Sequence, residues 1–119
     1  MTLNKNGYND EIIKICLSGV KVLDEKKAFN TILLDLREVN SYLDYFLITS
    51  GNSKIHCRSL ARELQKTFVG LGLRILNKPD LDSGWIILDF GELIIHVFTE
   101  EIRYYYNLEK LWADAGRIV

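Results

Sequence analysis

The sequence predicts a single domain of the α/β class, built on one mixed β-sheet flanked by helices. Its 119 residues suffice for one hydrophobic core. Apolar residues make up 48% of the chain and charged residues 26%, which is ordinary for a globular protein. The periodicity of the apolar residues runs helix, two strands, helix, three strands, helix. We therefore interpret residues 1–119 as one domain, with an ordered core at about 10–115.

The first helix is expected at Asp10–Leu23, where apolar residues recur every three or four positions. Asn9 or Asp10 can cap it, because a short side-chain oxygen reaches the free amides of the first turn. Two strands are expected next, at Thr31–Leu36 and Tyr45–Thr49. Both are apolar at successive positions, which is typical of strands covered on two faces.

The rest of the chain is expected to complete the sheet. A stripe of apolar residues predicts a helix at Lys54–Gly70. Two strands on either side of Asp89–Glu92 predict an antiparallel hairpin. The remaining expected elements are, in order, a strand at Leu73–Leu76, a surface loop at Lys78–Gly84, the hairpin strands Trp85–Leu88 and Leu93–Phe98, and one or two helices between Glu100 and Ala115.

The turn Ser50–Ser53 lies between a strand and a helix, where free backbone amides can cap the helix or bind a phosphate. Nucleotidyl transfer also needs carboxylates that hold a divalent metal. Asp80 and Asp82 have a D-x-D spacing, but they belong to the loop around Pro79 and are interpreted as turn residues. We therefore predict no metal site and no cofactor.

The two histidines, His56 and His96, lack the sequence context of a catalytic base. His96 lies inside an apolar strand and is interpreted as a packed or hydrogen-bonded histidine. No G-x-S-x-G nucleophile motif occurs, and the His and Cys residues are too scattered for zinc. The cysteines, Cys16 and Cys57, are expected to be buried thiols. We predict no catalytic residue, so a binding module is favoured over an enzyme.

The distribution of charge says more than the net charge of −1. The segment from Pro79 to Ile102 contains six acids and neither Lys nor Arg, which predicts an acidic end suited to a basic partner. The aromatic residues Trp85 and Phe90 lie in this segment and are candidate anchors of an interface. The expected helix 54–70 carries a basic stripe that could face phosphates, formed by Lys54, Arg58, Arg62 and Lys66.

Three motifs in this chain resemble the ribosomal silencing factor family, also called the Iojap family. The resemblance extends from about Ile12 to Ala115. The motifs are Asp44-Tyr45-Phe46-Leu47-Ile48 with Ser50-Gly51-Asn52-Ser53, then Trp85 to Glu92 with His96-Val97-Phe98, and finally Tyr106-Asn107-Leu108-Glu109-Lys110-Leu111-Trp112. The resemblance implies a fold similar to that of nucleotidyltransferases, without their activity.

The resemblance also implies a function. Members of this family bind the large ribosomal subunit at the ribosomal protein numbered fourteen, block joining of the small subunit and so silence translation when nutrients run low. The motifs place the contact with that protein on Trp85, Asp89, Gly91, Glu92 and His96, with Asp44 and Tyr45 as further candidates.

Other partners and functions remain open from the sequence. A nucleotide-using enzyme and an RNA-binding module that uses the basic stripe, with contact to ribosomal RNA, are the alternatives. A homodimer through an exposed Trp85 is a further expectation. No membrane span and no organellar leader is recognised, so we expect a cytoplasmic protein.

Overall fold

The computed structural model describes residues 10–119 of the chain. Within this range the helices and strands follow the predicted order, with one strand missing in the middle and one added at the end. The elements are α1 (Asp10–Glu25), β1 (Phe29–Asp35), β2 (Tyr45–Gly51), α2 (Lys54–Gly70), β3 (Trp85–Asp89), β4 (Leu93–Thr99), α3 (Glu100–Tyr106), α4 (Leu108–Leu111) and β5 (Gly116–Arg117).

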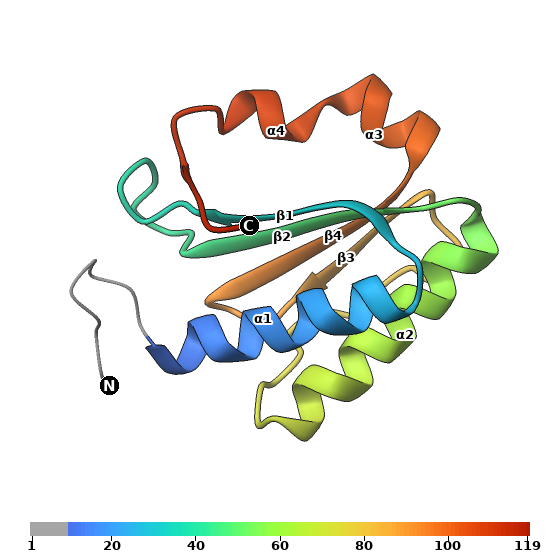
Figure 1. Ribbon diagram of the computed structural model, residues 1–119, viewed down its shortest axis with the longest axis horizontal. Coiled ribbons are helices and arrows are strands. Elements are labelled where there is room, and N and C mark those ends of the chain that lie inside the picture. Colours follow the sequence, from blue (N-terminus) through green and yellow to red (C-terminus); the bar gives the residue numbers. More distant parts are fainter. Residues whose placement is uncertain (1–9) are drawn as a thin grey trace.

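The strands form one mixed sheet in the order β3-β4-β2-β1-β5. The central pair, β2 and β4, is parallel, and every other pair is antiparallel. Helices α1 and α2 cover one face of this sheet, and α3 and α4 cross the other (Figure 1). The arrangement confirms the prediction of a mixed sheet flanked by helices.

Alternate side chains of the strands fill two apolar layers, one on each side of the sheet. The layer under α1 and α2 is the larger one, and it takes the apolar stripe of α2 (Cys57, Leu60, Ala61, Leu64 and Phe68). The layer under α3 and α4 contains Phe46, Ile48 and Phe98, with Trp112 packed against them. All seven residues of β2 are buried, as expected for a strand covered on two faces.

The ends of the two long helices follow the sequence closely. Helix α2 has the predicted bounds, and the Ser53 hydroxyl accepts a hydrogen bond from the His56 amide at 3.1 Å. Helix α1 begins at Asp10 and runs two residues beyond the predicted Leu23. The proposed cap residue Asn9 and the side chain of Asp10 lie outside the described residues.

The predicted strand at Leu73–Leu76 is wrong. This segment runs beside β3, but a single backbone hydrogen bond, from the Leu76 amide to the Asp89 carbonyl at 2.7 Å, joins the two. The next contacts are made by the Asn77 side chain: its Nδ2 donates to the Ile87 carbonyl at 2.8 Å and its Oδ1 accepts from the Asp89 amide at 2.9 Å. A side-chain amide thus takes the place of a strand's backbone.

The C-terminal segment contains the expected helices and one short strand that was not predicted. Asn107 adopts a left-handed conformation with φ 46°, which divides the predicted helical region into α3 and α4. The strand β5 was not predicted: Gly116 and Arg117 pair with Asp35 and Leu34 of β1. None of the helices within residues 10–119 is both long and apolar enough to cross a bilayer.

Both cysteines are buried free thiols, as predicted. Burial raises the pKa of Cys16 to about 12 and also raises the pKa of Cys57. Both side chains are therefore protonated at neutral pH and pack as small apolar groups.

Candidate functional site

Strands β3 and β4 bring most of the predicted contact residues onto one face of the sheet. Their register pairs Trp85 with Phe98, Ile87 with His96 and Asp89 with Ile94. Because side chains alternate along a strand, these six residues point to the side of the sheet that α3 and α4 cross. We call Trp85, Ile87, Asp89, Ile94 and His96 the β3–β4 face.

Trp85 is held in place on this face by three aromatic neighbours. Its indole Nε1–H donates to His96 Nδ1 at 3.0 Å, and its ring stacks on Phe98 with centroids 4.9 Å apart. Tyr106 of α3 contacts the ring on another side, with centroids 5.0 Å apart. Trp85 nevertheless stays partly exposed, so a partner would meet a large apolar side chain that is already fixed.

His96 is buried behind Trp85 in this face. It is only 5% exposed, so its ring supports Trp85 and is barely accessible to a partner. Burial lowers the pKa of His96 to about 4, and the neutral ring accepts the indole proton at Nδ1. The interpretation of His96 as a packed, hydrogen-bonded histidine fits this geometry better than that of a contact residue.

Two residues outside the predicted set of contact residues, Ile87 and Tyr106, belong to the same surface. Ile87 is 38% exposed between Trp85 and Asp89, and Tyr106 flanks Trp85 from α3. Strand alternation alone places Ile87 with its two neighbours, so this residue could have been found from the sequence. Tyr106 could not, because its contact depends on how α3 folds back over the sheet.

The hairpin turn presents the acidic part of the site. The Asp89 carboxylate accepts a hydrogen bond from the Gly91 amide at 2.8 Å, and Glu92 is exposed at the tip. Gly91 has φ +84°, a conformation that glycine adopts without strain. The structure therefore gives Gly91 a role in shaping the turn.

Asp44 and Tyr45 lie at the same end of the sheet but diverge in orientation. The Tyr45 amide donates to the Glu92 carbonyl at 3.0 Å, which places Asp44 next to the hairpin turn. The Tyr45 side chain is 2% exposed and packs in the layer under α1 and α2, with the Arg37 guanidinium 5.4 Å above its ring. The structure thus groups Asp44 with the acidic turn and separates the Tyr45 side chain from the β3–β4 face.

The predicted single acidic end is divided in two by the hairpin. Asp89 and Glu92 lie at the turn, whereas the Gly84 carbonyl accepts from the Thr99 amide at the opposite end of both strands. Asp82 precedes β3 and Glu100 follows β4 at that opposite end, and the Asp82 carboxylate binds Arg58 at 3.1 Å. Of the six acids in the described segment 79–102, Asp89 and Glu92 are the two at the turn beside the β3–β4 face.

The outer edge of β3 is closed by the chain itself. The Asn77 side chain and the Leu76 amide bind the outward groups of Ile87 and Asp89, and the Ser83 hydroxyl accepts from the Trp85 amide at 3.1 Å. Little backbone remains open to an added strand. A partner would therefore be recognised through side chains of the β3–β4 face.

The turn that could have bound a phosphate is a helix cap. His56 fixes it: Nδ1 accepts from the Asn52 amide at 3.0 Å, and Nε2 lies 2.8 Å from the Lys26 carbonyl, to which it donates. The adjacent hollow is lined by one cation, Lys54, and by two carboxylates, Glu100 and Glu101, which would repel a phosphate. No group of three or more metal-ligating side chains occurs within residues 10–119.

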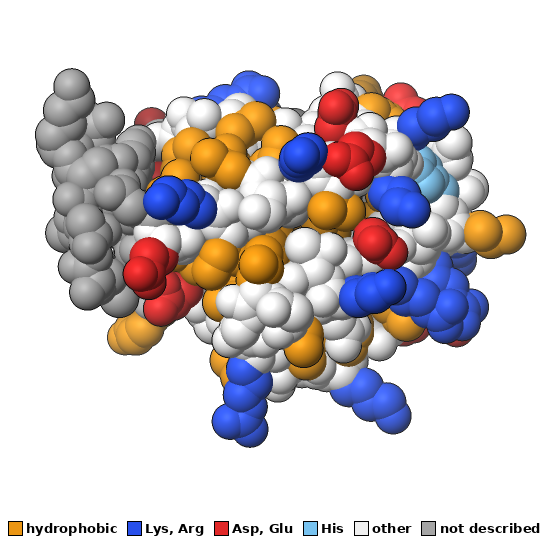
Figure 2. Space-filling model, turned by 60° about the horizontal axis from the view of Figure 1, so that its bottom comes forward, with side chains coloured by type: hydrophobic (Ala, Val, Ile, Leu, Met, Phe, Trp, Pro, Cys, Tyr) orange, Lys and Arg blue, Asp and Glu red, His pale blue; other side chains and the backbone are white. Residues whose placement is uncertain are grey.

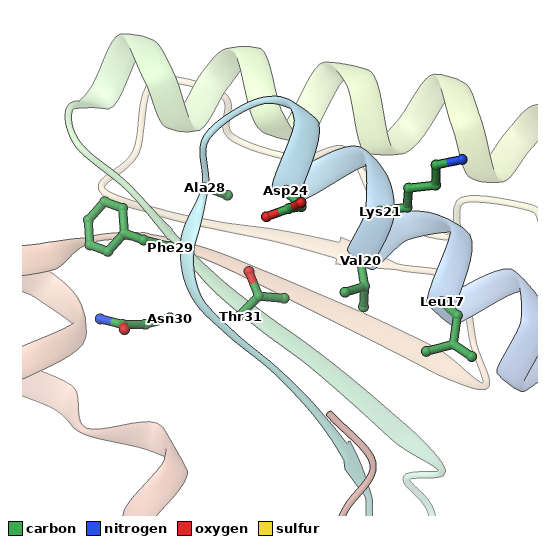
Figure 3. Close-up of a pocket in the computed structure, with 8 residues that line it drawn as sticks. All are labelled: Leu17, Val20, Lys21, Asp24, Ala28, Phe29, Asn30 and Thr31. Carbon is green, nitrogen blue, oxygen red and sulfur yellow. The ribbon is translucent and has the colours of Figure 1, made fainter.

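A second hollow, of about 400 Å³, lies between α1 and the start of β1 (Figure 3). Its lining includes one carboxylate, Asp24, and one amine, Lys21, whose side chain extends away from the other residues in Figure 3. The Thr31 hydroxyl shares a hydrogen bond with the Thr49 hydroxyl, and the two oxygens are 2.7 Å apart. This hollow holds no nucleophile beside a base, so it does not support the enzyme alternative.

The basic stripe lies on a different side of the molecule from the β3–β4 face. Lys54, Arg58, Arg62 and Lys66 are all exposed on α2, which covers the opposite face of the sheet. The contact residues and the RNA-facing residues predicted from the sequence are therefore two separate surfaces.

Comparisons with known proteins bear on what these surfaces do. The family model described as "Ribosomal silencing factor during starvation" matches residues 9–119. The ribosomal silencing factor RsfS of Halalkalibacterium halodurans is 35% identical over 111 residues, covering 92% of each chain. That of Bacillus subtilis is 38% identical over 105 residues, covering 87% of this chain and 86% of its own.

More distant relatives and solved structures agree with this result. The mouse protein named "Mitochondrial assembly of ribosomal large subunit protein 1" is 33% identical over 98 residues, which are 78% of this chain and 42% of that protein. A crystal structure from Chromobacterium violaceum matches with a TM-score of 0.81 at 26% identity, over 86% of each chain. One from Bacillus halodurans matches with a TM-score of 0.71 at 34% identity, over 87% of this chain and 95% of that one.

Proposed function

The chain belongs to the ribosomal silencing factor family, and on that premise we propose that it binds the large ribosomal subunit through the β3–β4 face and keeps the small subunit from joining. The partner on the large subunit is the ribosomal protein numbered fourteen. The outcome is repression of translation in the cytoplasm when nutrients are limiting. The names of the bacterial relatives and of the mouse large-subunit assembly protein support a ribosomal role.

The observation that carries the proposal is the fixed, partly exposed Trp85 beside an acidic turn. Trp85 and Ile87 offer an apolar centre, and Asp89 with Glu92 offers negative charge at its border. Tryptophan in a prearranged setting is a common energetic centre of protein interfaces, and border charges select the partner. A ribosomal protein is commonly basic, which suits this combination.

Blocking the small subunit requires bulk and no turnover. The chain measures 39 × 31 × 25 Å, and one face of the sheet would be used for docking. The rest of the molecule then projects from the large subunit into the space of the incoming small subunit. We therefore propose a steric mechanism in which affinity and position, without chemistry, determine the effect.

Sedimentation of purified bacterial subunits tests the proposal. Large subunits, small subunits or both are mixed with the chain and separated on sucrose gradients. We expect the chain to migrate with large subunits and the joined particle to diminish as the chain is added. Binding that leaves subunit joining intact would refute the steric mechanism, and absence of binding would refute the proposal as a whole.

Charge reversal on the acidic turn locates the contact. Asp89→Lys and Glu92→Lys should each weaken binding to large subunits at least about tenfold, because a basic partner would then face a like charge. Asp114→Lys is the matched control, since Asp114 is exposed close to β5, at the opposite edge of the sheet. Equal affinity of all three variants would remove the turn from the interface.

A further inference from the structure

The outer face of α2 has a one-sided charge. Four of its eight exposed residues are cations and none is an acid: Lys54, Ile55, Arg58, Ser59, Arg62, Lys66, Val69 and Gly70. The one acid of this helix, Glu63, is half-buried and lines the groove between α1 and α2. Arg58 is paired with Asp82, and Lys54 lines a hollow with Glu100 and Glu101. A partner that approaches α2 from solvent therefore meets positive charge chiefly at Arg62 and Lys66.

Two further cations extend this surface past the start of α2. Lys26 and Lys27 are exposed in the turn after α1, and the bond from His56 to the Lys26 carbonyl holds that turn against α2. Figure 2 looks onto the side made by α1 and α2 and shows Lys and Arg side chains along it, several of them grouped near the histidine at one end. Asp24 and Glu25 precede these lysines and offset part of their positive charge, whereas α2 itself has no exposed acid.

The stripe has the dimensions and the chemistry of a phosphate contact. Twelve residues separate Lys54 from Lys66, which corresponds to about 18 Å along the helix. A nucleic-acid strand carries one phosphate about every 3.4 Å along its axis, so such a row passes several of them. The exposed residues include no aromatic side chain that could anchor a protein partner.

The stripe lies on the other side of the sheet from the proposed docking surface, and the loop before β3 links the two sides. Helix α2 packs under β3 and β4, and the ion pair between Arg58 and Asp82 joins it to the loop that leads into β3. A chain docked through the β3–β4 face would therefore leave the stripe open to a second contact.

We propose that Arg62 and Lys66, with Lys54 and Arg58 as further contacts, bind the phosphate backbone of ribosomal RNA at a second contact, separate from the protein contact. This inference rests on the proposed function, and it adds a second, sequence-independent attachment. The protein contact would set the position on the subunit, whereas the phosphate contact would add affinity that depends strongly on salt.

The salt dependence of binding tests the phosphate contact. The double variant Arg62→Gln/Lys66→Gln is compared with Lys14→Gln/Arg117→Gln, which removes the same charge from exposed positions outside the stripe. Dissociation constants for purified large subunits are measured by co-sedimentation at several salt concentrations. Loss of two phosphate contacts should lower the slope of log Kd against log salt by about 1.5, so that the defect shrinks about eightfold between roughly 50 and 200 mM.

The control double variant should keep the wild-type slope. If both double variants keep it, or if both lose it equally, the stripe makes no specific phosphate contact and the inference is overturned while the proposed function stands. If the wild-type chain does not bind large subunits at all, the proposed function fails and this inference fails with it.

A crosslink then distinguishes RNA from an acidic protein surface. Ser59 is exposed beside Arg58 and Arg62, so Ser59→p-benzoylphenylalanine places a photoreactive group within the stripe. Irradiation on large subunits should attach the chain to ribosomal RNA, detected as a stop in primer extension. Attachment to ribosomal protein alone would overturn the inference.

Discussion

Acid should destabilise this fold through His96. The buried ring has a pKa of about 4 in the folded chain, against an ordinary value of 6.5 in the unfolded chain. Between these values the unfolded chain binds a proton that the folded chain excludes, so the free energy of unfolding falls as pH is lowered from about 6.5 to about 4. Above about pH 7 both states are neutral at His96, and its contribution does not change.

The size of the effect follows from the two pKa values. Each pH unit in the window corresponds to about 1.4 kcal/mol, so His96 alone should lower the free energy of unfolding by about 2.5 kcal/mol between about pH 7.5 and pH 4.5. Protonation also removes the acceptor for Trp85, because both ring nitrogens of a charged imidazole donate. Tryptophan fluorescence should therefore report the change before the chain unfolds.

Urea unfolding followed by circular dichroism at several pH values measures this effect. The variant His96→Phe keeps an aromatic ring and cannot titrate, so its stability should change much less over the window. His56→Gln, which removes the other histidine, should keep the acid dependence that belongs to His96. The same acid dependence in wild type and His96→Phe would refute the assignment to His96.

Three further substitutions test single features. Trp85→Ala should weaken binding to large subunits by about 2–4 kcal/mol, because it removes an interface anchor. Tyr104→Ala, at a residue that is 89% exposed on α3, should change the affinity little. Equal effects of the two variants in co-sedimentation would contradict the role of Trp85. Asn77→Ala should lower the free energy of unfolding by about 1–3 kcal/mol in urea titrations, because two hydrogen bonds to β3 are lost. It should also raise aggregation, because the edge of β3 becomes exposed. A variant with wild-type stability and solubility would contradict the role of Asn77 at this edge. Gly91→Ala should lower the melting temperature, because Gly91 has φ +84°. Gly70→Ala is the control and should leave the melting temperature unchanged or raise it, because nothing lies within 4 Å of the added carbon. A lower melting temperature for Gly70→Ala than for Gly91→Ala would contradict the turn geometry.

Most of the fold could be predicted because local patterns and tertiary structure agree. Helix α2 is an example: its small-residue turn, its cap Ser53 and its apolar stripe all indicate the same bounds. The prediction of a strand at Leu73–Leu76 was wrong because the segment makes one backbone hydrogen bond to β3, and the side chain of Asn77 makes the next contacts, which periodicity does not reveal. Strand β5 was missed because two residues carry no pattern of their own and form a strand only by pairing with β1.

The candidate site was predictable in part. Trp85 and Asp89 share a face because strand alternation requires it, and the turn at Gly91 follows from the sequence. Alternation also explains why the side chains of Tyr45 and Phe46 enter opposite layers. A packed His96 could be predicted from its place in an apolar strand, whereas its bond to Trp85 could not, because it depends on the register between β3 and β4.

The position of β4 in the sheet governs how the chain can reach its fold. This strand lies between β2 and β3, yet it occupies residues 93–99 of 119. Its parallel pairing with β2 joins segments more than forty residues apart, and such distant pairings slow folding because a long loop must close first. During synthesis, the apolar surfaces of the earlier elements therefore remain exposed to solvent until β4 is available; these elements are α1, β1, β2 and α2. A chain that is cut short before β4 should be unable to fold and should be prone to aggregate.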